Sequence, residues 1–288
     1  MALPLASPVD VATYGHYSFD TSGTRYRFTG RIAADGPFPP EPGRYHVYAG
    51  WFCPWSQRIT ITLALTGLTG TVSVSYVDNA RDGRGWAFRE RYGPDPVNGF
   101  TLLREAYQAT EPGFAGLVSV PALWDREKRQ LVSNAYPTIE LDLATRFGRP
   151  VVDVYPAGQR PEIDALDEWI GPSVNHGVGA AATAGPEGAR ARAGLLDAFA
   201  RLDERLAGQP FLVGDAVTLA DIRLWVTLVR YDVGPNAQRA IHPGLHEFPH
   251  LWAYARRLYT IPAFRDTTDF SSFALPGVEL PDWTAVSA

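Results

Sequence analysis

The stretch from Tyr45 to Val77 decides the fold, and it reads YHVYAGWFCPWSQRITITLALTGLTGTVSVSYV. Residues 45–49 alternate in the manner of a short strand. A helical pattern covers residues 56–65 and ends at Gly67, after which residues 72–77 alternate again. A strand, a helix and a second strand in this order favour parallel pairing of the strands through a right-handed crossover.

Two further strands and a helix complete the predicted sheet. The strands are expected over 122–124 and 130–132, and the helix over 136–147. The segment 78–118 before them is rich in Gly, Pro and charged residues and is too long for an ordinary connection. We therefore expect it to be functional or to form small elements of its own, within an α/β domain.

The chain divides by composition into four parts. We expect an extended arm on the surface over 1–42, an α/β domain over 43–150, an all-helical domain over 151–270 and a polar tail over 271–288. The helical domain is predicted from apolar stripes at helical spacing, followed by a capping box that begins at Thr218. The stripes cover residues 161–176, 187–206 and 249–259.

Composition excludes several classes of protein. The 288 residues include 26 basic and 31 acidic side chains, so no basic field is available to bind nucleic acid. No apolar run approaches the roughly 20 residues that span a bilayer, and the first ten residues do not resemble a secretory signal. We expect a soluble cytoplasmic protein without a membrane partner. Lys128 is the only lysine, a bias typical of a GC-rich genome.

Cys53 is the only cysteine, so the chain cannot form an intramolecular disulfide or a cysteine-based zinc site. Pro54 follows it where a helix begins, and proline suits the first helical turn. The sulfur would then face free backbone N–H groups, which can lower a cysteine pKa from about 8.5 to roughly 3.5–7.5. The alternative is that Cys53 is a small buried apolar residue.

Val120 and Pro121 directly precede a predicted strand and are a candidate for a cis peptide bond. A cis bond would turn the Val120 backbone outward as a docking edge for a peptide-like thiol. The alternative is an ordinary trans proline at the start of an edge strand.

Aromatic and basic residues near the cysteine suggest a pocket. Most of the residues Trp51, Phe52, Trp55, Trp86 and Trp169 lie close to Cys53 in sequence or in the long segment. They are either core residues or an aromatic wall for a flat electrophile such as a quinone. Arg58, one helical turn beyond Cys53, either stabilises a thiolate or pairs with an acid.

A metal site is not expected. His242, His246 and His250 are spaced by four, but Pro243 and Pro249 interrupt any helix that would align them.

The chain resembles the glutathione transferase superfamily, and within it the xi class, the glutathionyl-hydroquinone reductases. The resemblance covers about residues 40–270. The matching stretches are YHVY (45–48), CPWSQR (53–58), GWAF (85–88), DPVNGF (95–100), LREAY (103–107), VPALWD (120–125), DEW (167–169), NHGV (175–178) and the block from FLVGD (211–215) to Arg230.

This resemblance implies a thioredoxin-like N-terminal domain, an all-α C-terminal domain, a homodimer and an active site between the domains. In the class, a cysteine attacks the sulfur of a glutathionyl-hydroquinone, the hydroquinone leaves, and a second glutathione regenerates the cysteine. No permanently bound cofactor is implied. Cys53 matches the nucleophile, Trp86 a residue that packs against the bound thiol, and Val120 its backbone partner.

The expected site extends beyond these three matches. The thiol is expected to contact Phe52, Trp86, Val120, Pro121, Ser133 and Asn134. The substrate pocket is expected to include Trp55, Trp169, His176 and Tyr231, with Arg58 supporting the thiolate.

The sequence departs from the family pattern at two recognition sites. Ala135 and Tyr136 occupy the positions of a Glu-Ser pair that holds the γ-glutamyl group, and Gly179 replaces a tyrosine that addresses the hydroquinone. The later tyrosine-bearing loop is also shorter, over 231–238. With the GC-rich composition, these changes suggest a thiol other than glutathione, such as mycothiol, in an actinomycete-like host.

Three functions therefore remain open at this point. The first is reductive removal of a thiol from an aromatic conjugate through a Cys53 mixed disulfide, which suits a protein that has no second cysteine to resolve it. The second is a catalytically silent module that binds a ligand or a protein. The third is ordinary conjugation of a thiol to an electrophile, for which Cys53 would not be required.

Overall fold

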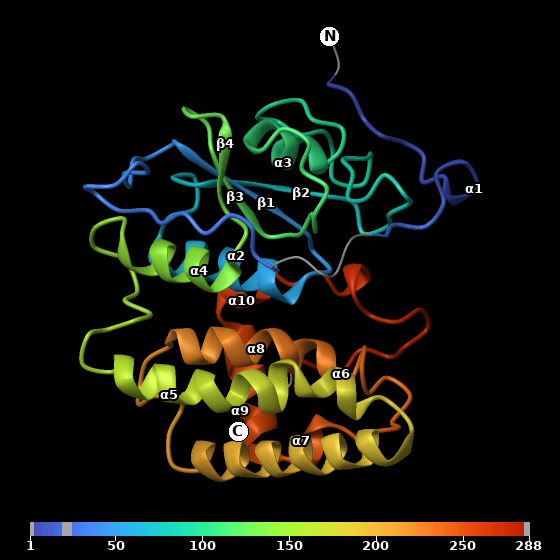
Figure 1. Ribbon diagram of the computed structural model, residues 1–288. Coiled ribbons are helices and arrows are strands. Elements are labelled where there is room, and N and C mark those ends of the chain that lie inside the picture. The colour runs from blue at the N-terminus through green and yellow to red at the C-terminus, as the bar shows by residue number, and fades with distance from the viewer. Residues whose placement is uncertain (1–2, 19–24, 285–288) are drawn as a thin grey trace. The chain divides into compact units, whose positions relative to one another are not determined.

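In the computed structural model of the chain, the strands form one mixed sheet in the order β2-β1-β3-β4 (Figure 1). β1 (Tyr45–Ala49) pairs in parallel with β2 (Ser73–Tyr76) and antiparallel with β3 (Ala122–Asp125). β3 pairs antiparallel with β4 (Gln130–Ser133). All four predicted strands are confirmed, and their ends shift by one residue at most.

The structure describes residues 3–18 and 25–284. The chain divides into two compact units, Met1–Val151 and Val152–Ala288. The predicted fold class is confirmed, because the first unit holds the mixed sheet and the second is built from helices.

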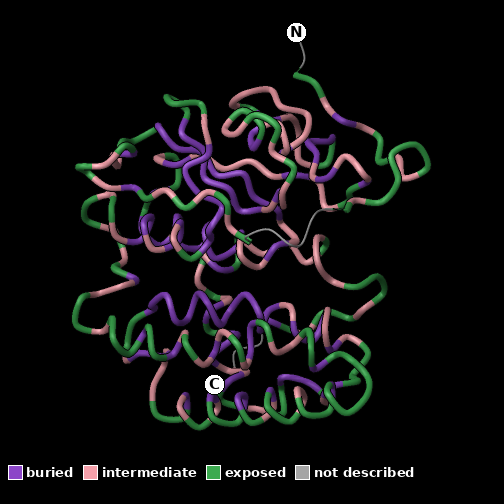
Figure 2. The backbone as a smooth tube through the Cα atoms, viewed as in Figure 1, coloured by how far each residue is buried: buried purple, intermediate pink, exposed green. Residues whose placement is uncertain are grey.

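The two faces of the sheet are covered by different parts of the chain because strand side chains alternate. Val47 points into a core that is shared with α2 (Pro54–Thr66) and α4 (Tyr136–Thr145). Tyr48 points into the opposite core, which contains α3 (Arg104–Thr110) and the long segment before β3. β1, β3 and β4 are accordingly buried over most of their length, whereas β2, at one edge of the sheet, is only partly buried (Figure 2). Cys53 belongs to the second core.

Buried carboxylates organise the segment 78–118. The side chain of Asp95 accepts the backbone N–H groups of Val97, Asn98 and Phe100 at 3.0–3.1 Å and the Tyr48 hydroxyl at 3.2 Å. A fully buried carboxylate needs such donors. The segment therefore forms an ordered layer over one face of the sheet.

The N-terminal arm is extended, but the expectation that it lies on the surface is wrong for part of it. Ile32 is fully buried in the same core as Val47, because burying its apolar side chain is favourable in free energy. Thr29 forms a bridge with Ser133 beside β4. Gly30 allows this approach, since a Cβ atom there would lie 2.6 Å from the Val132 carbonyl oxygen. The arm also contains a short helix, α1 (Val11–Tyr14).

The second unit consists of helices around the buried helix α8. Their bounds are α5 (Arg160–Ile170), η1 (Gly171–Asn175), α6 (Gly177–Ala181), α7 (Gly185–Leu206), α8 (Leu219–Tyr231), η2 (Leu245–Glu247), α9 (Pro249–Thr260), α10 (Pro262–Arg265) and η3 (Phe270–Ser272). α8 packs against α5, η1 and α9. The predicted capping box is present, with the Asp221 carboxylate accepting the Thr218 N–H at 2.7 Å.

One expectation for this unit needs correction. The helix predicted over 161–176 ends as an α-helix at Ile170 and continues as a π-helical turn, in which His176 N–H donates to the Gly171 carbonyl. Pro172 causes the change, because proline lacks the N–H that an α-helix requires. The polar tail is anchored by Trp283, whose ring is buried against Trp225 and Trp252.

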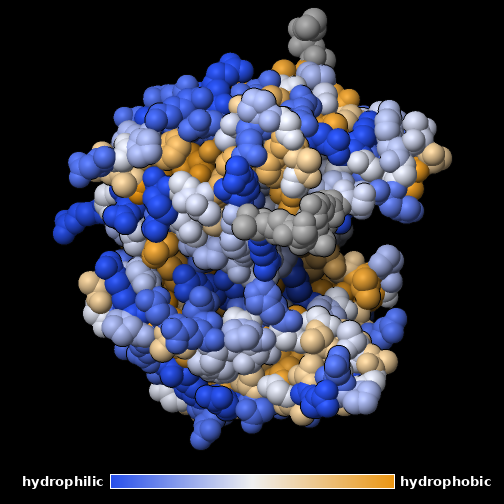
Figure 3. Space-filling model, in the orientation of Figure 1, coloured by the Kyte–Doolittle hydropathy of each residue, from blue (hydrophilic) through white to orange (hydrophobic). Residues whose placement is uncertain are grey.

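The surface seen in Figure 3 is a mosaic of hydrophilic and apolar side chains. In the described part of the chain, no helix combines the length and the apolar character that crossing a bilayer requires.

Candidate active site

Cys53 lies where β1 has ended and α2 begins. It is the N-cap residue, Pro54 occupies the first helical turn, and Gln57 N–H donates to the Cys53 carbonyl at 3.1 Å. The side chain makes no N-cap hydrogen bond, although the sequence suggested that the sulfur would face the free N–H groups. The Sγ atom lies 3.5 Å from the Val120 carbonyl oxygen and donates to it, as a thiol does. The residue is 7% exposed.

The Val120–Pro121 peptide bond is cis, as predicted. The residue before it is held in place by Tyr107, whose hydroxyl donates to the Ser119 carbonyl at 2.7 Å and accepts the Ser119 N–H at 3.1 Å. The Val120 backbone is therefore presented to the sulfur from a rigid loop.

One aromatic wall near the sulfur is formed by Phe52 and Trp86, whose rings stack with centroids 4.5 Å apart. Both side chains are half-buried and pack against the core that contains Cys53. Trp86 also carries the guanidinium of Arg81, 4.4 Å from the ring centroid. The structure thus brings Phe52 together with Arg81 and Trp86, which lie in a later part of the chain.

A second wall is formed by Trp55 and Tyr136, stacked with centroids 4.6 Å apart. The Arg58 guanidinium lies over both rings, at 4.7 Å from Trp55 and 5.4 Å from Tyr136. Tyr26 from the arm meets Tyr136 edge-on. Burial raises the pKa of Tyr26 to about 12, so this phenol is neutral at physiological pH. Tyr136 therefore fills with aromatic packing the position where the family pattern has a serine.

Ser133 and Asn134 hold the N-terminal arm, so we remove them from the expected thiol contacts. The Asn134 side-chain oxygen accepts the Phe28 N–H at 3.0 Å, and the Asn134 backbone N–H donates to the Phe28 carbonyl at 2.9 Å. The Ser133 hydroxyl donates to the same carbonyl at 3.2 Å and accepts the Ala135 N–H at 3.0 Å. Both side chains are buried, and the Asn134 side-chain N–H donates to the Ser119 hydroxyl at 3.4 Å, so their polar atoms are occupied by contacts within the protein.

The remaining expected pocket residues belong to the helical unit. Trp169 is half-buried, and the Arg201 guanidinium lies 4.6 Å from its ring centroid. His176 is exposed at the start of α6. Tyr231 ends α8 instead of opening a loop, and its ring is fully buried edge-on to Phe199. We therefore drop Tyr231 from the expected pocket, because a ligand cannot reach a ring packed in this way.

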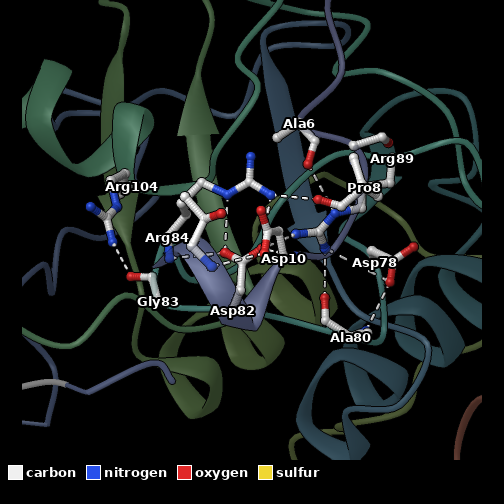
Figure 4. A network of polar contacts seen from close by, with 12 residues as sticks. Ala6, Pro8, Asp10, Asp78, Ala80, Asp82, Gly83, Arg84, Arg89 and Arg104 are labelled. Atoms are coloured by element: carbon white, nitrogen blue, oxygen red, sulfur yellow. Dashed lines mark hydrogen bonds and ion pairs between the residues drawn. The ribbon is translucent and has the colours of Figure 1, made fainter. Parts of the chain in front are cut away.

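The turn that carries Trp86 is fixed by Asp82, a fully buried carboxylate (Figure 4). Arg84 donates to both of its oxygens, at 3.0 and 2.8 Å, and Arg89 approaches at 3.4 Å. The Asp10 N–H donates to it from the arm at 3.0 Å. The hydrogen bonds from Arg84 hold the pKa of Asp82 well below its usual range, so the group is ionised.

The same arginines bind the arm directly. Arg84 donates to the Pro8 carbonyl at 2.7 Å and Arg89 to the Ala6 carbonyl at 3.1 Å (Figure 4). Sequence reasoning missed this network. The available signal was the run Asp82-Gly-Arg-Gly85, in which an acid and a base flank glycines that permit close backbone approach.

Among residues 3–18 and 25–284, no group of three or more His, Cys, Asp or Glu side chains is arranged to hold a metal ion. The groups that this site offers are a sulfur at a helix N-terminus, a backbone carbonyl beside it, and two aromatic walls with cationic partners.

Comparisons with known proteins agree with this architecture. The family model described as "Glutathione S-transferase, C-terminal domain" matches residues 185–257. The glutathionyl-hydroquinone reductase PcpF of Sphingobium chlorophenolicum is 38% identical over 226 residues, which cover 74% of this chain and 72% of that protein.

Solved structures of glutathione transferases are also similar to this chain. The glutathione-S-transferase Xi from Phanerochaete chrysosporium aligns with a TM-score of 0.81 at 31% identity, covering 87% of this chain and 89% of that one. The glutathione-bound structure of YqjG from Escherichia coli K-12 aligns with a TM-score of 0.79 at 32% identity, covering 85% of each chain.

Proposed function

The chain belongs to the xi class of the glutathione transferase superfamily, and we propose that it removes a low-molecular-weight thiol from a quinone-like or aromatic S-conjugate. The observation that carries the proposal is the position of Cys53, at the first turn of α2 and 3.5 Å from the Val120 carbonyl. A thiolate at a helix N-terminus is stabilised by the helix dipole and by nearby N–H groups.

The proposed reaction has two steps. The Cys53 thiolate attacks the sulfur of the conjugate, the S–S bond forms, and the electron pair of the carbon–sulfur bond passes to the aromatic carbon, which takes a proton. The arene is thereby reduced and Cys53 is oxidised to a mixed disulfide. A second thiol then attacks the outer sulfur as a thiolate, so that a small-molecule disulfide leaves and the Cys53 thiolate returns.

The aromatic half of the conjugate is proposed to lie between the two walls. Stacked pairs such as Phe52–Trp86 and Trp55–Tyr136 present flat apolar faces, which suit a flat ring. The relatives PcpF and YqjG, which are both named glutathionyl-hydroquinone reductases, support the same substrate class. We propose Trp169 and His176 as further contacts from the helical unit of a homodimeric cytoplasmic enzyme.

The thiol is proposed to be glutathione or mycothiol. The glutathione-bound structure of YqjG supports glutathione. Ala135 and Tyr136 favour another thiol, because neither offers a charge or a free hydroxyl in the place of the Glu-Ser pair. The loss of two charge-assisted contacts would weaken glutathione binding by orders of magnitude unless another residue replaces them.

The test compares turnover of a glutathionyl-naphthohydroquinone and of its mycothiol counterpart by the wild-type protein and by Cys53→Ser. The proposal predicts release of the hydroquinone by wild type and none by Cys53→Ser. Release of the hydroquinone by Cys53→Ser at the wild-type rate would show that Cys53 is not the nucleophile and would overturn the proposal.

A silent binding module is the second candidate, and the burial of Cys53 at 7% exposure is the observation that favours it. Alkylation of Cys53 measured against pH separates the two. A rate that rises only near pH 8.5, as for free cysteine, together with no turnover, would assign the silent module.

A further inference from the structure

Arg81 is an exposed cation held in a defined orientation beside the aromatic wall of the proposed site. Its guanidinium lies 4.6 Å from the ring centroid of Tyr17 and 4.4 Å from that of Trp86. Trp86 stacks in turn on Phe52, the neighbour of Cys53. The side chains therefore form a series, Tyr17–Arg81–Trp86–Phe52, that leads from the arm to the cysteine loop.

The backbone around Arg81 is built to keep this series in place. The arm lies directly on the turn, since Gly83 N–H donates to the Gly15 carbonyl at 2.7 Å. A Cβ atom at Gly83 would lie 1.8 Å from the Tyr14 carbonyl oxygen, and one at Gly85 would lie 3.1 Å from the Tyr17 ring. Only glycine at these positions admits the arm, which carries Tyr17 onto Arg81.

Among the residues that the structure describes, Arg81 differs from Arg84 and Arg89 in having no anionic partner. Arg84 and Arg89 are both paired with Asp82. In the described part of the chain, no carboxylate forms an ion pair with Arg81, and no hydrogen bond uses its N–H groups. Stacking between two rings occupies only the faces of a guanidinium, so its N–H edge stays available. That edge is suited to a carboxylate, which it binds with two parallel hydrogen bonds.

We propose that Arg81 is the anion-recognition residue of the Cys53 site, and that it binds a carboxylate of the thiol half of the S-conjugate, which is the glycine carboxylate when the thiol is glutathione. The proposal rests on the proposed function. It names a thiol that bears a carboxylate, such as glutathione, in preference to mycothiol, which has none. We assign the carboxylate to the thiol half because Trp86 connects Arg81 to Phe52, the residue next to the sulfur of Cys53.

This contact would offset part of what Ala135 and Tyr136 remove. A charge-assisted hydrogen bond at a partly exposed site changes affinity by about tenfold. Arg81 thus gives this chain a route to an anionic thiol that does not use the start of α4.

The experiment measures dissociation constants by calorimetry for wild type, Arg81→Gln and the control Arg149→Gln. Arg149 is an exposed arginine of the same unit for which no hydrogen bond, ion pair or ring contact is present among the described residues. The ligands are S-benzylglutathione, its glycine ethyl ester and S-(4-carboxybenzyl)glutathione. None of them needs to be turned over.

We expect Arg81→Gln to weaken the binding of S-benzylglutathione about tenfold and to leave the binding of the ester unchanged. Arg149→Gln should bind every ligand as wild type does. A loss confined to the carboxybenzyl ligand would place the anion on the aromatic half and overturn the assignment to the thiol. Equal losses for all ligands would mean a structural role for Arg81, and no loss would mean none; both overturn the proposal. If the ligands bind wild type and Arg81→Gln with equal affinity, the proposal about Arg81 fails and the proposed function is unaffected. If wild type binds none of them, the Arg81 proposal fails, whereas the proposed function is then decided by turnover of the mycothiol conjugate.

Discussion

Replacing the buried carboxylate of Asp82 should release the arm from the turn that carries Trp86. In Asp82→Asn an uncharged amide faces Arg84 and Arg89, which then remain as buried or half-buried cations without their partner. Breaking a buried ion pair from one side costs about 3–5 kcal/mol. The Asp10 N–H and the arm carbonyls bound by the two arginines are attached to the same network, so the loss falls on the docking of the arm.

Amide hydrogen exchange resolves this loss by position. A cost of about 3 kcal/mol corresponds to a rise of about 100-fold in the opening equilibrium, which should appear as faster exchange over residues 6–17 and 78–89. Exchange in the helical unit should not change. Asp35→Asn is the matched control, because Asp35 is exposed and forms no hydrogen bond or ion pair with the described residues.

The effect should also depend on pH in a defined direction. The pKa of Asp82 is lowered in the folded state, so its contribution is complete above the unfolded pKa of about 3.9 and is lost as the pH falls below it. The difference between wild type and Asp82→Asn should therefore be constant from pH 5 to 8 and shrink below pH 4. Exchange that changes less than fivefold at pH 7, or that changes equally in Asp35→Asn, would refute the reasoning.

Three further predictions concern stability. Burial lowers the pKa of His46 to about 3, so the unfolded state binds a proton that the folded state excludes. Acidification from pH 7 to 5 should therefore lower the free energy of unfolding, measured by urea titration, by about 2 kcal/mol. His46→Gln should lose this pH dependence, and an unchanged pH dependence in the variant would contradict the prediction. Asn134→Ala should leave the Phe28 N–H unpaired and cost about 1–3 kcal/mol, measured as faster amide hydrogen exchange around Phe28. Unchanged exchange there would argue against the stabilising role of the Asn134–Phe28 hydrogen bond. Thr218→Ala should remove about 1 kcal/mol of stability and so lower the midpoint of thermal unfolding. Asp221→Ala should lower it further, because Asp221 accepts hydrogen bonds from Leu212, Thr218 and Tyr254. Equal effects of the two variants would be evidence against the buried network around Asp221.

The elements that the sequence predicts well are those whose signal is local. β1 and α2 follow from alternation and from helical spacing within a few residues, and the Cys53-Pro54 junction locates the helix start. The capping box at Thr218 is likewise contained within four residues.

The features that sequence reasoning missed depend on contacts between distant residues. Nothing near Ile32 indicates that it enters the core of the sheet, and nothing near Asn134 indicates that its amide will bind Phe28. The stacking of Arg81 between Tyr17 and Trp86 requires the arm and the turn to meet, which only the folded chain shows. Trp283 is missed for the same reason, since its partners lie on other helices.

Single-turnover mass spectrometry of the Cys53 adduct tests the central claim most directly. Wild-type protein is mixed with one equivalent of glutathionyl-naphthohydroquinone, without any second thiol, and its intact mass is measured while the free hydroquinone is quantified. The account predicts that one hydroquinone is released for each chain that gains the mass of the thiol half, with the adduct at Cys53 and removable by added thiol. Release of hydroquinone with no adduct on Cys53, or an unmodified protein beside an intact conjugate, would contradict it.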